Sequence, residues 1–293
     1  MPSLHTFAVP VRMPFDWESL LAFLRLRATP GVETVTDSAY IRTIAEATAP
    51  ATLRVTYDRA NAGLHISYAG AADARGTVES RVRQIFKTDV STGPIEAFLG
   101  RDLWLAGYVA RQPGLRVPGG WSTFEVAMRA ILGQQISVSA GTTLVGRLVR
   151  LAGTRVNEID WLFPSPEQVL AADLAGLGIP QKRLQTLRSL AALFAEQGEE
   201  CLRRDDAMDR LLAISGIGRW TAGYILMRTA ENHDYWPEGD LVLRKALSKR
   251  KELVNPAKLA RAFSRWSPYR SYATIHIWRG YVSSTNSAAI NHD

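Results

Sequence analysis

Residues 211–240 combine a glycine hairpin with a lone carboxylate. Gly216 and Gly218 lie between two apolar helical segments, and Asp240 follows about twenty residues later. Glycine adopts positive φ and lets another backbone approach closely, while amides at the start of a helix have no intrahelical acceptor. These features predict a site for an anion, for which phosphate is the natural occupant. A tight helix–helix turn that binds nothing is the alternative interpretation.

Asp240 stands at the boundary between a chain break and a helical segment. Pro237, Glu238 and Gly239 precede it, and the apolar run LVLRKAL follows. An aspartate in this position is expected to cap the helix by accepting a backbone amide. A carboxylate that stays ionised in a dry pocket also stabilises a developing sugar cation. Capping and catalysis are therefore compatible roles.

Three aromatic residues are candidates for stacking on a base. Trp220 begins the second hairpin helix, Tyr224 lies one turn further along the same face, and Trp278 lies in the last helical segment. Aromatic rings hold a flipped, electron-deficient base by stacking and cation–π attraction. Ordinary core packing is the alternative for each ring taken by itself.

The segment Gly133-Gln134-Gln135-Ile136 interrupts an apolar helical pattern with a glycine and two polar residues. Such an interruption predicts a bend, or a loop tip that probes DNA. A solvated turn accounts for the same residues equally well.

The composition excludes several kinds of site. The single cysteine, Cys201, rules out a disulfide framework, a cysteine-based zinc site and a four-cysteine iron–sulfur cluster. The five histidines show no metal-ligand spacing. There is no signal-peptide core at the N-terminus, and no apolar run approaches the length of a membrane span. We therefore expect a cytoplasmic protein that has no membrane partner.

The net charge of +7 lies entirely in the second part of the chain. Residues 1–110 contain 11 basic and 11 acidic residues, whereas residues 111–293 contain 24 basic and 17 acidic residues. Arginine accounts for 29 of the 35 basic residues, and its planar guanidinium suits phosphate. A coding bias explains the ratio of arginine to lysine, but not the asymmetry between the two parts. The excess charge accompanies the hairpin and favours nucleic acid as the partner.

The elements that must position these residues fall into two domains. Residues 1–112 are predicted to form a mixed α/β domain, in which Asp16 caps the first helix and the strands have the spacing of an antiparallel sheet. The expected helices of this domain span 16–28 and 74–88, and the expected strands span 38–47, 51–58 and 63–70.

Residues 113–293 are predicted to form a helical domain. Ser165, Pro166 and Gln168 have the spacing of a capping box with proline at the first helical position. The region 123–153 is expected to form one or two long helices, and the hairpin pair spans about 207–230. The other expected helices span 165–173, 181–197, 255–266 and 267–281. The fold class is an α+β domain followed by an all-α domain.

Several segments in this order resemble the helix–hairpin–helix DNA glycosylase superfamily, and within it the 3-methyladenine DNA glycosylase II (AlkA-type) family. The segments that carry the resemblance are DWESLLAFLRLRATPGVETV (16–35), GLRVPGGWSTFEVAMRAILGQQISV (114–138), LGIPQKR (177–183), GIGRWTAGYILMR (216–228), PEGDL (237–241) and RWSPYRSYATIHIW (265–278). Together they extend over nearly the whole chain.

The resemblance implies a fold, an activity and a set of site residues. It implies an N-terminal domain similar to half of the TATA-binding protein, and hydrolysis of the N-glycosidic bond of alkylated bases, such as 3-methyladenine and 7-methylguanine, in duplex DNA by a monomer associated with the nucleoid. It assigns the catalytic role to Asp240. The implied base pocket contains Phe23, Trp220, Tyr224, Leu241 and Trp278. The implied DNA contacts are Gln134, Gln135, Ser215, Gly216, Gly218, Arg219 and Thr221.

No cofactor is implied, although the family holds a monovalent cation, Na or K, on hairpin carbonyls. In this sequence those carbonyls would be the ones of Leu212, Ile214 and Ile217.

The sequence departs from the family pattern in ways that bear on mechanism. Bifunctional members of the superfamily have a nucleophilic lysine two residues after the second hairpin glycine, where this chain has Trp220. The chain is therefore expected to be monofunctional, because no amine is available for a Schiff base. Gln135 replaces a leucine wedge, Leu241 replaces a pocket tyrosine, and Ser215 replaces a proline. These changes leave open a related enzyme for deaminated or oxidised bases, and a non-catalytic DNA-binding protein remains the alternative of a different class.

Overall fold

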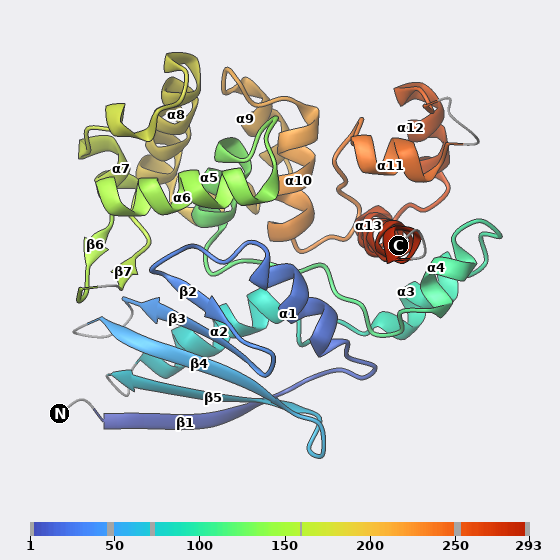
Figure 1. The fold of residues 1–293 in the computed structure, drawn as a ribbon, viewed down its shortest axis with the longest axis horizontal. Helices are drawn as coiled ribbons and strands as arrows, with labels where there is room; N and C mark the ends of the chain where they lie inside the picture. The colour runs from blue at the N-terminus through green and yellow to red at the C-terminus, as the bar shows by residue number, and fades with distance from the viewer. Residues whose placement is uncertain (1–2, 46–49, 71–73, 159, 249–252, 291–293) are drawn as a thin grey trace.

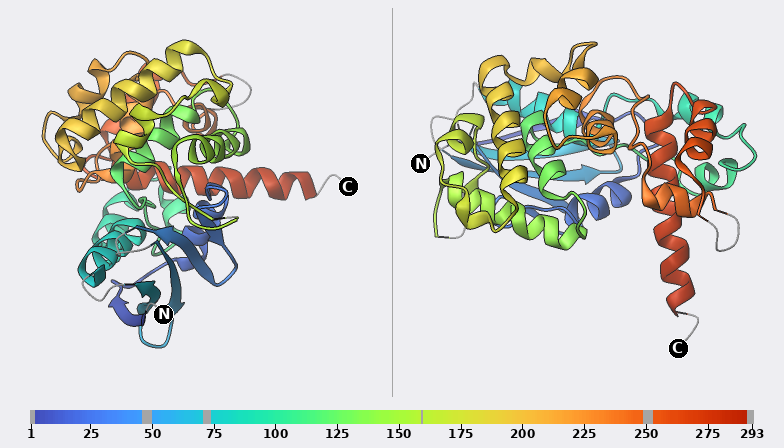
Figure 2. Two further views of the ribbon diagram at one scale, coloured as in Figure 1. Left: turned by 90° about the vertical axis from the view of Figure 1, so that its left-hand side faces the viewer. Right: turned by 90° about the horizontal axis from the view of Figure 1, so that it is seen from above.

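The computed structural model describes residues 3–45, 50–70, 74–158, 160–248 and 253–290. In Figure 1 a twisted sheet lies below a group of helices, and helix α1 lies between the two. Figure 2 shows the C-terminal end of the last helix, α13, extending beyond the other elements. None of the helices in the described ranges is both long enough and apolar enough to cross a bilayer.

Five antiparallel strands form the N-terminal sheet, in the order β1-β5-β4-β3-β2. Leu53 pairs with Tyr68 and Val55 pairs with Ile66, and these four side chains are buried on one face. The strands are β1 (Ser3–Pro10), β2 (Glu33–Val35), β3 (Ala39–Ile44), β4 (Ala51–Asp58) and β5 (Gly63–Gly70). The strands predicted from the sequence are confirmed as β3, β4 and β5, whereas β1 and β2 were not anticipated.

Two helices pack on the sheet. Helix α1 (Trp17–Arg25) begins at its predicted N-cap, because the Asp16 carboxylate accepts the Ser19 N–H at 2.9 Å. Helix α2 (Arg75–Phe86) buries a face that contains Val78 and Val82 against the strands. Both helices correspond to those predicted from apolar spacing.

The remaining elements are almost all helical. The Ser165–Gln168 capping box is present at the start of α7, as predicted. The helices are α3 (Thr92–Leu99), α4 (Ala106–Ala110), α5 (Thr123–Leu132), α6 (Val138–Ala152), α7 (Pro166–Ala171), α8 (Gln181–Gln197), α9 (Ala207–Ala213), α10 (Arg219–Thr229), α11 (Leu241–Ala246), α12 (Pro256–Ser264) and α13 (Arg270–Ile290). Shorter elements are the 3-10 turns η2 (Ala175–Leu177) and η3 (Glu199–Leu202) and the two-stranded sheet of β6 (Thr154–Arg155) and β7 (Trp161–Leu162).

The hydrophobic side chains form three clusters. One cluster joins the sheet to α1 and α2, a second joins α5 to α10, and a third joins α3 and α4 to α11, α12 and α13. Helices α3 and α4 lie on the N-terminal side of the predicted division at residue 112, yet they pack with the C-terminal helices. Phe23 contacts the first and third clusters, and Tyr224 contacts the second and third. The junction of the three clusters therefore lies around these two rings.

A buried group of charges attaches the sheet to helix α5. Arg42 on β3 forms an ion pair with Glu125 on α5 at 3.1 Å, and Arg129 on α5 pairs with Glu125 at 2.5 Å and with Glu33 on β2. Tyr40 donates its hydroxyl proton to Glu33. Burial alone would raise the pKa of Glu33, but the guanidinium groups of Arg129 and Arg42 outweigh it and hold that pKa at about 2. All four charges are thus compensated inside the protein.

We expect Arg42→Met to destabilise the fold by about 3–5 kcal/mol, because it leaves buried carboxylates without their cation. Urea unfolding followed by circular dichroism measures this free energy. Arg59→Met is the matched control, since the Arg59–Glu18 pair is exposed and should contribute less than about 1 kcal/mol. Equal effects of the two substitutions would contradict a structural role for the buried charges.

Candidate active site

The glycine hairpin joins α9 to α10 and has one buried residue between two exposed glycines. Ile217 is buried in the second cluster and anchors the turn, while Gly216 and Gly218 are exposed. Gly216 has φ +95°, and a Cβ placed there would lie 2.2 Å from Oγ1 of Thr186. The position requires glycine for both reasons. No side chain caps the first amides of α10, so these N–H groups are free to bind an anion.

The predicted DNA-contact residues of the hairpin differ in their exposure. Ser215 and Arg219 are exposed, and the Arg219 guanidinium lies 3.8 Å from Glu238. Thr221 is buried, and its hydroxyl accepts the Gln134 amide at 2.9 Å. The Thr221 side chain therefore faces the protein interior, and the Thr221 backbone N–H is one of the uncapped amides in the first turn of α10.

The loop between α5 and α6 lies beside the hairpin. Gln134 donates its side-chain amide to the Gly216 carbonyl at 3.0 Å as well as to Thr221. Gln135 is exposed and has φ +60°, a left-handed conformation that is uncommon for a residue with a side chain. The side-chain amide of Gln134, an implied DNA contact, is thus held by the hairpin. Gln135 is the free tip of the loop.

Asp240 is the point where three segments converge. Its side chain is 7% exposed and accepts three hydrogen bonds. Oδ1 accepts the Leu243 amide at 2.9 Å and the Trp278 indole N–H at 3.0 Å, and Oδ2 accepts the Trp220 indole N–H at 2.9 Å. Asp240 is thus the N-cap of α11, as predicted, and at the same time the acceptor that fixes both tryptophans.

The aromatic residues form a continuous wall next to this carboxylate. The rings of Trp220 and Tyr224 are nearly parallel, with centroids 5.4 Å apart and an interplanar angle of 4°. The Tyr224 and Trp278 centroids are 6.2 Å apart. Trp220 and Tyr224 lie one turn apart on α10, so the helix period places both on the same face.

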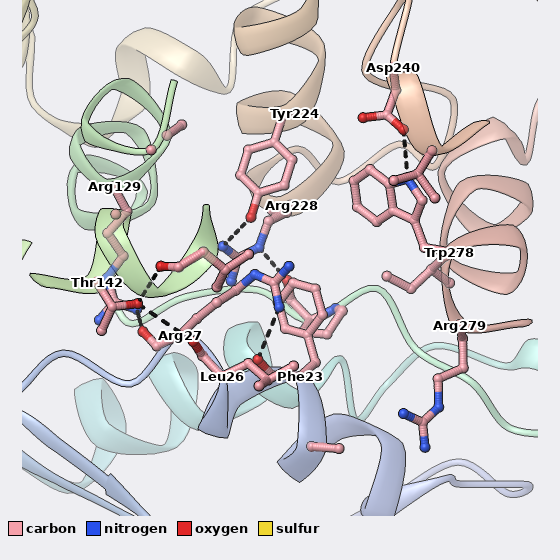
Figure 3. A pocket seen from close by; sticks show the side chains of 18 of the residues that line it. Phe23, Leu26, Arg27, Arg129, Thr142, Tyr224, Arg228, Asp240, Trp278 and Arg279 are labelled. Carbon is pink, nitrogen blue, oxygen red and sulfur yellow. Dashed lines mark hydrogen bonds between the residues drawn. The ribbon is translucent and has the colours of Figure 1, made fainter. Parts of the chain in front are cut away.

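A cavity of about 520 Å³ opens beside this wall. Figure 3 shows Phe23, Tyr224, Asp240 and Trp278 around it, contributed by α1, α10, the turn before α11, and α13. Its size suits a nucleobase or a somewhat larger group. The arrangement offers aromatic surfaces for stacking, a buried carboxylate to stabilise positive charge, and an anion site on the adjacent hairpin.

Comparisons with known proteins agree with this geometry. The family model of the AlkA N-terminal domain matches residues 6–122. DNA-3-methyladenine glycosylase 2 of Escherichia coli is 35% identical over 274 residues, which cover 90% of this chain and 94% of that protein. This chain belongs to the AlkA family. A probable bifunctional transcriptional activator/DNA repair enzyme AlkA of Mycobacterium tuberculosis is 34% identical, and the match covers 92% of this chain and 56% of that protein.

Solved structures show the same fold. The 3-methyladenine DNA-glycosylase of Archaeoglobus fulgidus superimposes with a TM-score of 0.81 at 21% identity, over 94% of this chain and 98% of that one. An 8-oxoguanine glycosylase/lyase of Clostridium acetobutylicum superimposes with a TM-score of 0.71 at 15% identity, over 93% of each chain. At these identities the likeness concerns the fold alone.

One residue expected in the pocket of this AlkA family member lies elsewhere. Leu241 was expected to form one wall of the pocket in place of a tyrosine. It is 51% exposed, however, and does not line the cavity. Val242 lines it instead. Asp240 occupies the cap position and turns inward, so the first residue of α11 turns outward and the second faces the cavity.

Sequence reasoning missed several arginines that line the cavity, notably Arg27, Arg129 and Arg228. Arg228 is buried, donates to the carbonyls of Pro118 and Gly119, and donates to the Tyr224 hydroxyl at 3.2 Å. The spacing in the sequence could have indicated Arg228, because it lies four residues after Tyr224 and therefore on the same face of α10.

The same guanidinium groups act on the tyrosine that they surround. Burial alone would raise the pKa of Tyr224, but Arg228 and Arg27 outweigh burial and lower it. The hydroxyl therefore lies in a strongly positive environment.

The predicted cation site consists of backbone carbonyls at the hairpin. The Ile214 carbonyl accepts the Ile217 N–H at 3.0 Å, which leaves its second lone pair available. Leu212 lies in the last turn of α9. Within the described residues, His, Cys, Asp and Glu form no group of three or more that could hold a metal ion. The carbonyl site stays a prediction.

We expect Gly216→Ala to destabilise the protein by about 1–3 kcal/mol, since alanine at φ +95° is strained and its Cβ meets Thr186. Gly218→Ala is the matched control, because Gly218 has φ −98° and an added Cβ there meets no atom within 4 Å. It should change stability by less than about 0.5 kcal/mol. Urea unfolding of the two variants measures the difference, and similar values would show that the turn does not need glycine at 216.

Proposed function

We propose that this chain is a monofunctional DNA glycosylase, which releases alkylated purines such as 3-methyladenine and 7-methylguanine from duplex DNA by hydrolysis of the N-glycosidic bond. The observation that carries the proposal is the buried Asp240 carboxylate, held by the indole N–H groups of Trp220 and Trp278 at the edge of a cavity with aromatic walls. The E. coli and A. fulgidus relatives are named 3-methyladenine glycosylases. A protein that bound DNA through the hairpin alone would not need this convergence.

DNA binding is assigned to the hairpin face. The free amides at Gly218 and the following residues bind a backbone phosphate, and the positive charge of residues 111–293 favours the approach of the polyanion. Gln135, at the exposed tip of the neighbouring loop, enters the base stack where the damaged nucleotide rotates out. One chain supplies all of these residues, so a monomer suffices for the reaction on the cell's own DNA.

A monovalent cation, Na or K, is assigned to the carbonyls of Leu212, Ile214 and Ile217. Carbonyl oxygens are suitable ligands for such ions. When bound there, the ion would add positive charge beside the DNA phosphate.

The flipped base lies against Trp220, Tyr224 and Trp278. A purine alkylated at N3 or N7 carries a positive charge, and stacking on electron-rich rings stabilises it. The bond between C1′ and the base nitrogen then breaks, and its electron pair goes to the base. The alkylated base leaves neutral, and the sugar becomes an oxocarbenium-like cation.

Asp240 stabilises this cation and the water that captures it. Its Oδ1 already accepts two N–H groups, whereas Oδ2 accepts only one. A carboxylate oxygen accepts two hydrogen bonds comfortably, so Oδ2 can orient the attacking water. The water oxygen bonds to C1′ and releases one proton to the solvent, which gives an abasic site and the free, neutral base.

We expect Asp240→Asn to lower the single-turnover rate of 7-methylguanine release by about 10²–10³-fold, because the negative charge beside the sugar cation is lost. Release of the base from an alkylated duplex, followed by chromatography, measures the rate. Asp209→Asn, at an exposed position on α9, is the control for loss of a carboxylate. Wild-type release by the Asp240 variant with unchanged unfolding behaviour would refute the assignment.

We also expect the products to contain intact strands with abasic sites. Trp220 stands two residues after Gly218, where a lyase would need an amine for a Schiff base. Incubation with damaged duplex and borohydride should trap no covalent protein–DNA adduct, and strand breaks should form only after alkali. A trapped adduct would show that another amine of the chain performs a lyase step.

A further inference from the structure

The loop between α5 and α6 is joined to the hairpin by the side chain of Gln134. Its Nε2 donates to the Gly216 carbonyl, 82 residues further along the chain, at 3.0 Å and to the Thr221 hydroxyl at 2.9 Å. Because a backbone carbonyl can only accept a hydrogen bond, the contact with Gly216 fixes which end of the amide faces the hairpin. Gln134 therefore links the exposed tip of the loop, Gln135, to the turn that offers its amides to a phosphate.

The N-terminal part of α8 holds the loop and the hairpin as well. Arg183 donates to the Gln134 carbonyl at 3.2 Å, and the Thr186 hydroxyl donates to the Ser215 carbonyl at 2.8 Å. Helix α5, which precedes the loop, packs against both α8 and α10 (Figure 1). The base of the loop and the hairpin thus belong to one hydrogen-bonded unit.

The tip of the loop depends on this unit for its position. Gln135 has φ +60°, and a side chain in the left-handed region stays there only where its neighbours hold it. On the side of α6 the support is steric, because a Cβ placed on Gly141 would lie 3.3 Å from Cα of Gly133. On the side of the hairpin the support is the Gln134 amide.

Opening a base pair places a mechanical demand on these contacts. A residue that enters the stack takes the place of a paired base, and rotation of that base out of the helix costs stacking and pairing energy. The tip can contribute only if it stays at a fixed distance from the phosphate that the hairpin binds, because a loop that yields leaves the base in the stack.

We propose that Gln134 is a positioning residue, whose side-chain amide holds the Gln135 tip in register with the phosphate site of the hairpin. It thereby couples binding of the DNA strand to rotation of the damaged nucleotide. Gln134 acts through Gln135 and the hairpin, and its role requires no contact between its amide and DNA. The inference rests on the proposed glycosylase function and deepens it.

The test measures single-turnover release of 7-methylguanine from two duplexes. In one the lesion lies opposite cytosine, and in the other it lies opposite an abasic analogue, where no pair has to be opened. We expect Gln134→Met, which keeps the length of the side chain but removes its donors, to lower release from the first duplex about 20-fold. Release from the second should stay within about threefold of wild type, because rotation of an unpaired base no longer limits the rate.

Substitutions of Thr221 test the same link from a side chain that is buried inside the protein. Thr221→Val keeps the shape but removes the acceptor, and it should lower release opposite cytosine about fivefold. Thr221→Ser keeps the acceptor and should restore the rate to within about twofold of wild type. With Thr221→Val added to Gln134→Met the loss should remain about 20-fold rather than reach about 100-fold, because the bond between them is already broken.

Gln168→Met is the matched control. Gln168 is half-buried like Gln134, and its amide donates to the Thr154 hydroxyl at 2.8 Å, between α7 and β6. At a temperature where circular dichroism shows the variants folded, Gln168→Met should leave release from both duplexes unchanged. If Gln134→Met does not fold, the comparison of Thr221→Val with Thr221→Ser carries the test.

Two results would overturn the inference and leave the proposed function intact. Equal losses of Gln134→Met in the two duplexes would show that the amide serves the chemical step or general stability. Wild-type release by Thr221→Val would show that the link to its hydroxyl does not position the loop. Absence of release by the wild type from either duplex would instead refute the function and the inference together.

Discussion

The burial of one carboxylate constrains the rest of the site. Asp240 is almost completely removed from solvent, and a charge in that situation requires hydrogen-bond donors. Two of its three donors are indole N–H groups from α10 and α13, and the third is a backbone amide of α11. Each indole is thereby held with its N–H edge toward the carboxylate, and both tryptophans line the cavity. The hydrogen bonds that the buried aspartate requires therefore also position the aromatic wall that a base would contact.

These hydrogen bonds to Asp240 form only if the surrounding packing brings α10, α11 and α13 together. Phe23 and Tyr224 lie where the hydrophobic clusters meet, and Arg228 ties the connection at Pro118 and Gly119 to the tyrosine. The ion pairs of Arg129 attach β2 to α5, which borders the same cavity. The N-terminal sheet thus contributes to the site indirectly, by fixing the end of α1 that holds Phe23. Its neutral overall charge is consistent with a supporting role.

Local signals in the sequence predicted much of the fold. The cap of Asp16, the capping box of Ser165 and the residue range of α8 follow from side chains a few positions apart. Strands β1 and β2 gave weaker signals, because β1 ends at a proline on the edge of the sheet and β2 has three residues.

The candidate site divides in the same way. The sequence predicted that Asp240 lies between a chain break and the start of a helix. It also predicted that Trp220 and Tyr224 share one face of a helix. Leu241 was placed in the pocket wall wrongly because the side on which its side chain emerges depends on the inward turn at Asp240. The arginines were missed because a sequence does not show which charges the fold will neutralise, and it is that neutralisation which decides what the cavity can do. Carboxylates and carbonyls accept hydrogen bonds from Arg129, Arg116 and Arg228, whereas the Asp240 carboxylate accepts hydrogen bonds only from uncharged N–H groups. A breaking glycosidic bond places positive charge on the sugar, and a fixed carboxylate beside the cavity stabilises that charge.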